Sequence, residues 1–184
     1  SKRMDIVLGV ALTSDSVRFV LAGGRNGDGE LVGQDSFYVD RRGGVESASV
    51  VEHVVNAVLG TYAVVTANGS TIRKIAVTWT DAVAVDAALL VDALDDVGLP
   101  GVVPVTGCDA VEGFAALVCV QDRRDGVAVC LVEGRTTPTA FIACAEHADG
   151  IRRVRSRVLP AADLHQVALS LRGARAEFDG DDMA

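Results

Sequence analysis

The side chains that most often carry catalysis or bind metals are few in this sequence of 184 residues. Zinc sites and thiol catalysis need cysteines at short spacing or beside a histidine. The four cysteines are spread over the second half of the chain without a CxxC pair: Cys108, Cys119, Cys130 and Cys144. We therefore predict four free and mostly buried thiols, as is usual in a reducing cytoplasm.

Histidines act as hydrolase bases when a nucleophile lies within reach. The three histidines are His53, His147 and His165, and no Gly-x-Ser-x-Gly nucleophile elbow accompanies them. The pattern places His53 and His165 in helices and His147 in a loop. We interpret all three as ordinary surface or helix residues.

Carboxylates converging on the centre of a sheet would support two-metal nuclease chemistry. The first predicted strand carries none between Ile6 and Leu12, which argues against a nuclease. Residues 26–30, Asn-Gly-Asp-Gly-Glu, have the composition of part of a calcium loop. They lack the spacing and flanking helices of an EF-hand, so we predict a hairpin turn there.

The charge balance limits the class of partner. Lysine and arginine number 17 against 25 acidic residues, a net charge of −8. This acidity argues against nonspecific nucleic-acid binding, which depends on basic groups at phosphates. One basic segment stands against this conclusion: residues 151–158, Ile-Arg-Arg-Val-Arg-Ser-Arg-Val. We interpret it as a strand whose basic face keeps the edge of a sheet soluble.

Membrane insertion is not expected in this segment. The longest apolar stretch near the start, Ile6 to Leu12, is far shorter than the roughly 20 residues of a membrane helix. We read it as a buried strand and expect a cytoplasmic protein.

Hydrophobic periodicity predicts the elements that must position these side chains. In the first part of the chain the strands are residues 5–11, 16–22, 31–39, 73–80 and 102–105, and the helices are 47–59, 82–97 and 109–120. The order βββαβαβα is typical of an α/β fold with a ribonuclease-H-like mixed sheet and flanking helices.

The last part of the chain repeats the opening pattern. Strands are predicted at residues 126–132, 136–143 and 152–159, followed by a helix at 161–171. We therefore expect a first ribonuclease-H-like lobe at 4–122, an incomplete second lobe with a truncated βββα unit at 123–173, and an acidic flexible tail at 174–184.

This order, together with three segments, resembles the superfamily of actin, the sugar kinases and the DnaK-type heat-shock chaperones. Residues 9–17 look like the first phosphate-binding hairpin of the chaperones, Gly-Ile-Asp-Leu-Gly-Thr-Thr. Residues 75–99 are similar to the chaperone strand and helix that end in Ala-Gly-Leu. Residues 126–137 look like the second hairpin, Asp-Leu-Gly-Gly-Gly-Thr. The resemblance implies an actin-like fold with two lobes that close over a nucleotide.

A closer resemblance is to mycobacterial actin-like proteins of unknown function. These begin Met-Asp-Ile-Val-Leu-Gly-Val, found here at residues 4–10, and carry a segment similar to Thr78-Trp79-Thr80-Asp81. Trp79, the only tryptophan, is interpreted as a core residue rather than the wall of a ligand pocket. This likeness spans most of the chain and implies no activity.

The resemblance implies that the first hairpin lacks the chemistry of the active superfamily. Ala11 stands where the metal-orienting Asp is expected, and Thr13 stands in place of a phosphate-approaching Gly. Ser14 keeps a hydroxyl for a phosphate, whereas the charge of Asp15 opposes one. Any residual nucleotide site in this hairpin would therefore consist of Thr13, Ser14 and Asp15.

The second hairpin is altered in the same way. Leu131 replaces the metal-orienting Asp, and the charge of Glu133 repels phosphate. Only Gly134, Thr136 and Thr137 keep a chemistry that permits phosphate binding. Two acids of the connecting helix align near the missing acid, and we interpret Asp109 as the helix N-cap and Glu112 as a first-turn acid.

These observations predict a catalytically inactive, actin-like module with no catalytic residues, no metal site and no resident cofactor. We expect it to bind a protein partner, or a second copy of itself, through the sheet edge of the second lobe. The alternative is a divergent nucleotide-binding protein: an ATP sensor, or a weak ATPase or phosphotransferase that uses ATP and Mg²⁺ at the two hairpins.

Overall fold

The computed structural model describes residues 3–40, 47–121, 127–133, 138–148, 150–159, 163 and 165–169. The chain divides into two compact units, unit 1 from Ser1 to Val105 and unit 2 from Thr106 to Ala184. The sequence pattern predicts that the first lobe ends at residue 122, whereas the structure divides the chain after Val105. The difference concerns the last helix of the first predicted lobe, which packs within unit 2.

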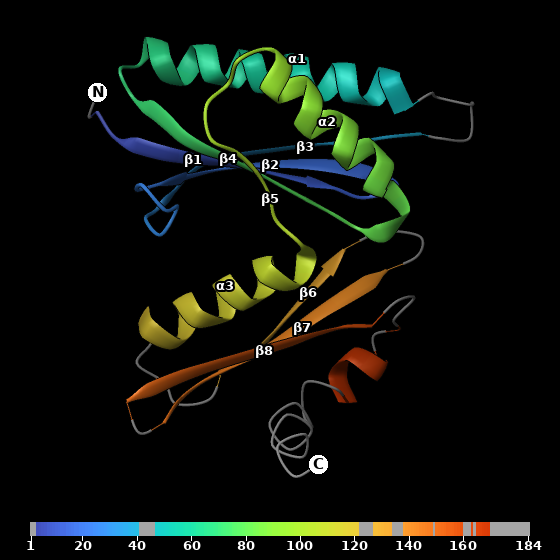
Figure 1. Cartoon of the computed structure of the whole chain (residues 1–184). Helices are drawn as coiled ribbons and strands as arrows, with labels where there is room; N and C mark the ends of the chain where they lie inside the picture. Colours follow the sequence, from blue (N-terminus) through green and yellow to red (C-terminus); the bar gives the residue numbers. More distant parts are fainter. Residues whose placement is uncertain are drawn as a thin grey trace. The chain divides into compact units, whose positions relative to one another are not determined.

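Unit 1 is a five-stranded mixed sheet in the order β3-β2-β1-β4-β5. Its strands are β1 (Asp5–Leu12), β2 (Ser16–Gly23), β3 (Leu31–Tyr38), β4 (Thr71–Trp79) and β5 (Val102–Pro104). The first three strands pair antiparallel, and β4 and β5 run parallel to β1. Its helices are α1 (Ser47–Ala67), the short 3-10 turn Asp81–Val83 and α2 (Ala84–Asp96) (Figure 1).

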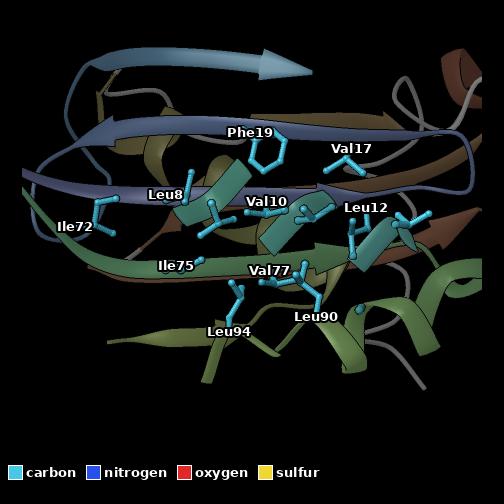
Figure 2. Close-up of a cluster of buried hydrophobic side chains, with 14 of the residues drawn as sticks. Leu8, Val10, Leu12, Val17, Phe19, Ile72, Ile75, Val77, Leu90 and Leu94 are labelled. Atoms are coloured by element: carbon cyan, nitrogen blue, oxygen red, sulfur yellow. The ribbon is translucent and has the colours of Figure 1, made fainter. Parts of the chain in front are cut away.

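The core of unit 1 lies between this sheet and the two helices. Alternate residues of β1 are buried because successive strand side chains point to opposite faces. Figure 2 shows Leu8 and Val10 of β1 beside Ile75 of β4, with Leu90 and Leu94 of α2 in the same cluster. The helix predicted after β4 ends as expected, since Gly98 has φ +78° and its N–H donates to Asp95 O in a Schellman motif.

Helix α1 extends to Ala67, beyond the predicted end at residue 59, and continues through Gly60. Among the helices in the described part of the chain, α1 alone has the length and mean hydropathy (1.4) of a membrane span. In this structure it packs on the sheet of unit 1, with a row of valines in the core: Val50, Val54, Val58 and Val65.

Unit 2 contains a three-stranded antiparallel sheet in the order β6-β7-β8. Its strands are β6 (Val127–Glu133), β7 (Thr139–Ala148) and β8 (Ile151–Leu159), and its helix is α3 (Gly107–Gln121). Residues 165–169 are also helical. The prediction of His147 in a loop was wrong, because β7 continues past it and His147 pairs with Arg152.

The central strand β7 is covered on both faces. Phe141, Ala143 and Ala145 pack with Val111 and Ala115 of α3. On the other face, Ala140 packs with Val167 of the helical segment at 165–169. The mixed sheet of unit 1 and the strand order of both units confirm the predicted actin-like, ribonuclease-H-like fold class.

Candidate functional site

The first hairpin is a closed two-residue turn between β1 and β2. Thr13 N donates to Ser16 O over 2.9 Å, and Ser14 and Asp15 form the tip. Val39 N donates to Asp15 O over 2.8 Å, which ties the chain after β3 to the same tip. The turn lies at the carboxyl end of β1, the edge at which open α/β sheets bind ligands.

The hydroxyl of Thr13 is used inside this turn. Thr13 is buried, and its Oγ1 accepts a hydrogen bond from Ser16 N over 3.0 Å. The same oxygen lies 2.8 Å from Ser16 Oγ and donates to Asp15 Oδ1 over 2.9 Å. A hydroxyl has one proton and two acceptor sites. The side chain in place of the superfamily's glycine therefore stabilises the turn and fills the space beside its backbone.

Only the tip of the hairpin is accessible to a ligand. Ser14 and Asp15 are half-buried, as is Ala11 at the position of the missing carboxylate. An anion approaching the tip meets the Asp15 carboxylate, and like charges repel. The structure thus brings Thr13, Ser14 and Asp15 together in one turn, with a hydroxyl and an acid but no metal-orienting carboxylate on strand β1.

The carboxyl end of β4 lies beside this turn. Thr80 N donates to Leu12 O over 3.1 Å, and Thr80 O accepts from Val83 N over 3.0 Å at the start of the 3-10 turn. Thr80 is buried, and Trp79 packs partly buried against the core of unit 1. The interpretation of Trp79 as a core residue agrees with this contact.

The candidate residues of the second hairpin, Gly134, Thr136 and Thr137, lie outside the described residues. Its two flanks are described: Glu133 is buried at the end of β6 and is paired with Thr139 of β7. Leu131, which stands in place of the second metal-orienting Asp, pairs with Phe141. Both flanks belong to unit 2, whereas the first hairpin belongs to unit 1.

The two acids of α3 have structural contacts. The N-cap prediction for Asp109 was wrong: α3 begins at Gly107, and Thr106 Oγ1 accepts from Asp109 N over 3.1 Å, as an N-cap side chain does. Glu112 Oε1 accepts a hydrogen bond from Ser156 Oγ over 2.6 Å and so links α3 to β8. This contact supports the structural interpretation of Glu112.

The remaining candidate groups are dispersed. Within the described ranges no three His, Cys, Asp or Glu side chains gather as a metal site would require. The four cysteines are free, as predicted. Cys119 and Cys144 are buried, and burial raises the pKa of the Cys130 thiol, which makes it a poor nucleophile. His53 packs its ring edge-on against Phe37, with centroids 4.6 Å apart.

Solved structures with the same fold are members of the Ppx/GppA family. The Aquifex aeolicus family member is 17% identical with a TM-score of 0.56, and it aligns over 86% of this chain and 52% of its own. The type II variant of the Aquifex aeolicus Ppx/GppA phosphatase is also 17% identical, with a TM-score of 0.53 over 85% of this chain and 52% of its own. The chain thus spans about half the length of these structures.

These matches show that the chain has an actin-like α/β fold. The chain belongs to the family of unknown function DUF7159, whose model matches residues 5–181. Comparison with curated proteins gives no match.

Proposed function

We propose that this chain is a catalytically inactive actin-like module that acts by binding another protein. The observation that carries the proposal is the first hairpin, where Ala11 replaces a carboxylate and the Thr13 hydroxyl is bonded within the turn. Mg²⁺ needs oxygen ligands such as carboxylates to hold it beside a nucleotide. Strand β1 supplies none between Ile6 and Leu12, so ATP hydrolysis in the manner of the superfamily lacks its metal-binding group.

The same proposal places the interaction surface on the edge strand β8 of unit 2. In the described part of that unit, β8 pairs with β7 on one side only. An unpaired strand edge is a template for a strand from another chain. The pairing register sets Arg153, Arg155 and Arg157 at alternate positions, hence on one face of the strand. Such a basic row favours an acidic partner surface.

Two finer expectations accompany this proposal. The free thiols fit a reducing cytoplasm. The resemblance of residues 4–10 and 78–81 to mycobacterial proteins supports the expectation that this chain has mycobacterial relatives.

The experiment on the interaction is light scattering with size exclusion over a range of micromolar concentrations. A dimer whose dissociation constant falls as salt is added supports pairing through β8, because two paired β8 strands bring like-charged arginines together and salt screens their repulsion. A monomer at every concentration contradicts the homodimer. The proposed partner is then a different protein with an acidic surface, and measuring the affinity for poly-glutamate peptides tests this. The alternative function, nucleotide binding with or without hydrolysis, is favoured by the half-buried Ser14 at the tip and is decided by the nucleotide measurement that closes the Discussion.

A further inference from the structure

Unit 1 contains a groove that the hairpin chemistry does not involve. It has a volume of about 640 Å³ and lies between helix α1 and the edge of the sheet formed by β2 and β3. Its floor is the apolar surface of Leu8, Phe19, Leu21 and Phe37. Pockets of this size are large enough to bury a ligand or a pair of large side chains.

Two glycines line the groove, and open space lies beside one of them, Gly60. Gly60 lies within α1, and a Cβ built there would have no atom within 4 Å. Gly33 lies within edge strand β3, opposite Leu21. A glycine inside a helix or strand costs about 0.5–1 kcal/mol relative to alanine. In the described structure no atom lies beside Gly60 that would explain why a glycine stands there.

The outer wall of the groove carries a negative charge. The register of β2 and β3 pairs Phe19 with Asp35 and Leu21 with Gly33, so Asp35 and Gly33 lie on the face of β3 that meets α1. Asp35 is exposed, and its Oδ1 accepts a hydrogen bond from Ser36 N over 2.8 Å. A carboxylate on the inward face of an edge strand deters pairing with apolar strands. The same carboxylate admits a strand that places a cation opposite it.

Within the described residues, the sheet of unit 1 has no strand paired with the edge beside the groove. Strand β3 is the terminal strand of the sheet in unit 1, paired with β2 on its other side. Leu31, Val32 and Tyr38 on this strand are exposed apolar side chains. A strand added to β3 would send every second side chain over the groove, next to those of β3.

We propose that β3 and this groove bind an extended peptide with the pattern apolar–x–Lys or Arg–x–aromatic, added antiparallel to β3. The apolar residue lies opposite Phe37, the cation opposite Asp35, and the aromatic ring opposite Gly33. The ring covers Gly33, as aromatic side chains across from edge glycines do, and reaches the open space beside Gly60. This site lies within unit 1 and is independent of the proposed β8 surface and of the hairpin.

The test uses fluorescein-labelled peptides and anisotropy with the full chain. The probe is Thr-Ile-Thr-Lys-Thr-Phe-Thr, and the control replaces its Lys by Glu. We expect the Lys peptide to bind and the Glu peptide to bind up to about fivefold more weakly, since a cross-strand charge pair contributes up to about that factor. Equal binding of the two peptides, or no binding of the Lys peptide, overturns the proposal.

Two variants locate the peptide in the groove. Gly60→Leu fills the groove and is expected to weaken the Lys peptide at least about tenfold, whereas Gly113→Leu, the same change at an open helical site of α3, leaves binding unchanged. Unweakened binding to folded Gly60→Leu overturns the assignment. Asp35→Lys is expected to reverse the preference in favour of the Glu peptide. Tighter binding of the Glu peptide to Asp35→Lys supports the proposal even if Gly60→Leu fails to fold. If Asp35→Lys still prefers the Lys peptide, the proposal is overturned.

Discussion

The Thr13 hydroxyl donates a hydrogen bond to Asp15 Oδ1 over 2.9 Å, across the tip of the first hairpin. This short bond joins the two residues that depart most from a phosphate-binding hairpin. The acid that opposes a phosphate is held by the hydroxyl that replaces a glycine. The hairpin therefore forms a closed structural turn.

The first prediction concerns the stability that this turn supplies. Thr13→Val keeps the shape of the side chain and removes the hydroxyl, leaving the buried N–H and hydroxyl of Ser16 without their partner. Loss of such a partner costs about 1–3 kcal/mol of unfolding free energy. Trp79 is the only tryptophan and lies in unit 1, so its emission during urea unfolding measures the loss there.

The matched control is Thr66→Val, the same change at an exposed position near the end of α1. It is expected to change the unfolding free energy by less than about 0.5 kcal/mol. A Thr13→Val protein as stable as wild type contradicts the hydrogen-bonded turn.

A second prediction concerns the packing of α3 on its sheet. A Cβ at Gly107 would overlap the ring of Phe141, so Gly107→Ala overpacks the core of unit 2. Such overpacking costs about 1–3 kcal/mol. Gly113→Ala, in open space on the same helix, is expected to stabilise α3 by about 0.5–1 kcal/mol.

Hydrogen exchange of α3 and β7 amides measures both variants, because unit 2 has no tryptophan. Gly107→Ala should speed exchange and Phe141→Leu should partly restore protection in its presence. Equal protection of Gly107→Ala and wild type would show that the ring does not lie against the helix.

A third prediction follows from the raised pKa of Cys130, which burial causes. The folded state keeps the proton to a higher pH than the unfolded state. The contribution of the protonated Cys130 thiol to the unfolding free energy is therefore complete below the pKa of the thiol in the unfolded state. It is lost as the pH rises through the pKa of the thiol in the folded state. Peptide-resolved alkylation by iodoacetamide, in native buffer and in urea, should show the Cys130 rate rising at a higher pH in the native protein. A native profile at the same or a lower pH refutes the burial effect.

Strand and helix order was predictable because it rests on local patterns. The alternation of β1 and the turn residues after α2 act over a few residues, and both predicted their elements correctly. The end of α1 was not predictable in this way. The apolar periodicity predicted a helix that ends at residue 59, yet tertiary burial of Val65 on the sheet extends it to Ala67.

In the candidate site, too, some features were predictable from the sequence and others depend on the tertiary structure. The sequence allowed Ala11 and Thr13 to be compared with the phosphate-binding hairpin that residues 9–17 resemble, whereas the hydrogen bonds of the Thr13 hydroxyl with Asp15 and Ser16 depend on the turn geometry. The groove beside β3 was missed because its glycines, Gly33 and Gly60, are far apart in the chain. Only the pairing of β2 with β3 and the packing of α1 bring them to one surface.

The most direct measurement is thermal unfolding of the full chain with millimolar ATP or ADP, each with Mg²⁺ or with EDTA. A ligand at about 100 times its dissociation constant adds about 2.7 kcal/mol, and each kcal/mol raises the midpoint by about 2–4 °C for a chain of this size. We predict no Mg²⁺-dependent rise with either nucleotide, because β1 carries no carboxylate between Ile6 and Leu12 and the Asp15 carboxylate accepts the Thr13 hydroxyl within the turn. A rise of several degrees that requires Mg²⁺, and that Ser14→Ala abolishes, would contradict a hairpin that holds no Mg²⁺–nucleotide and establish the nucleotide-binding alternative.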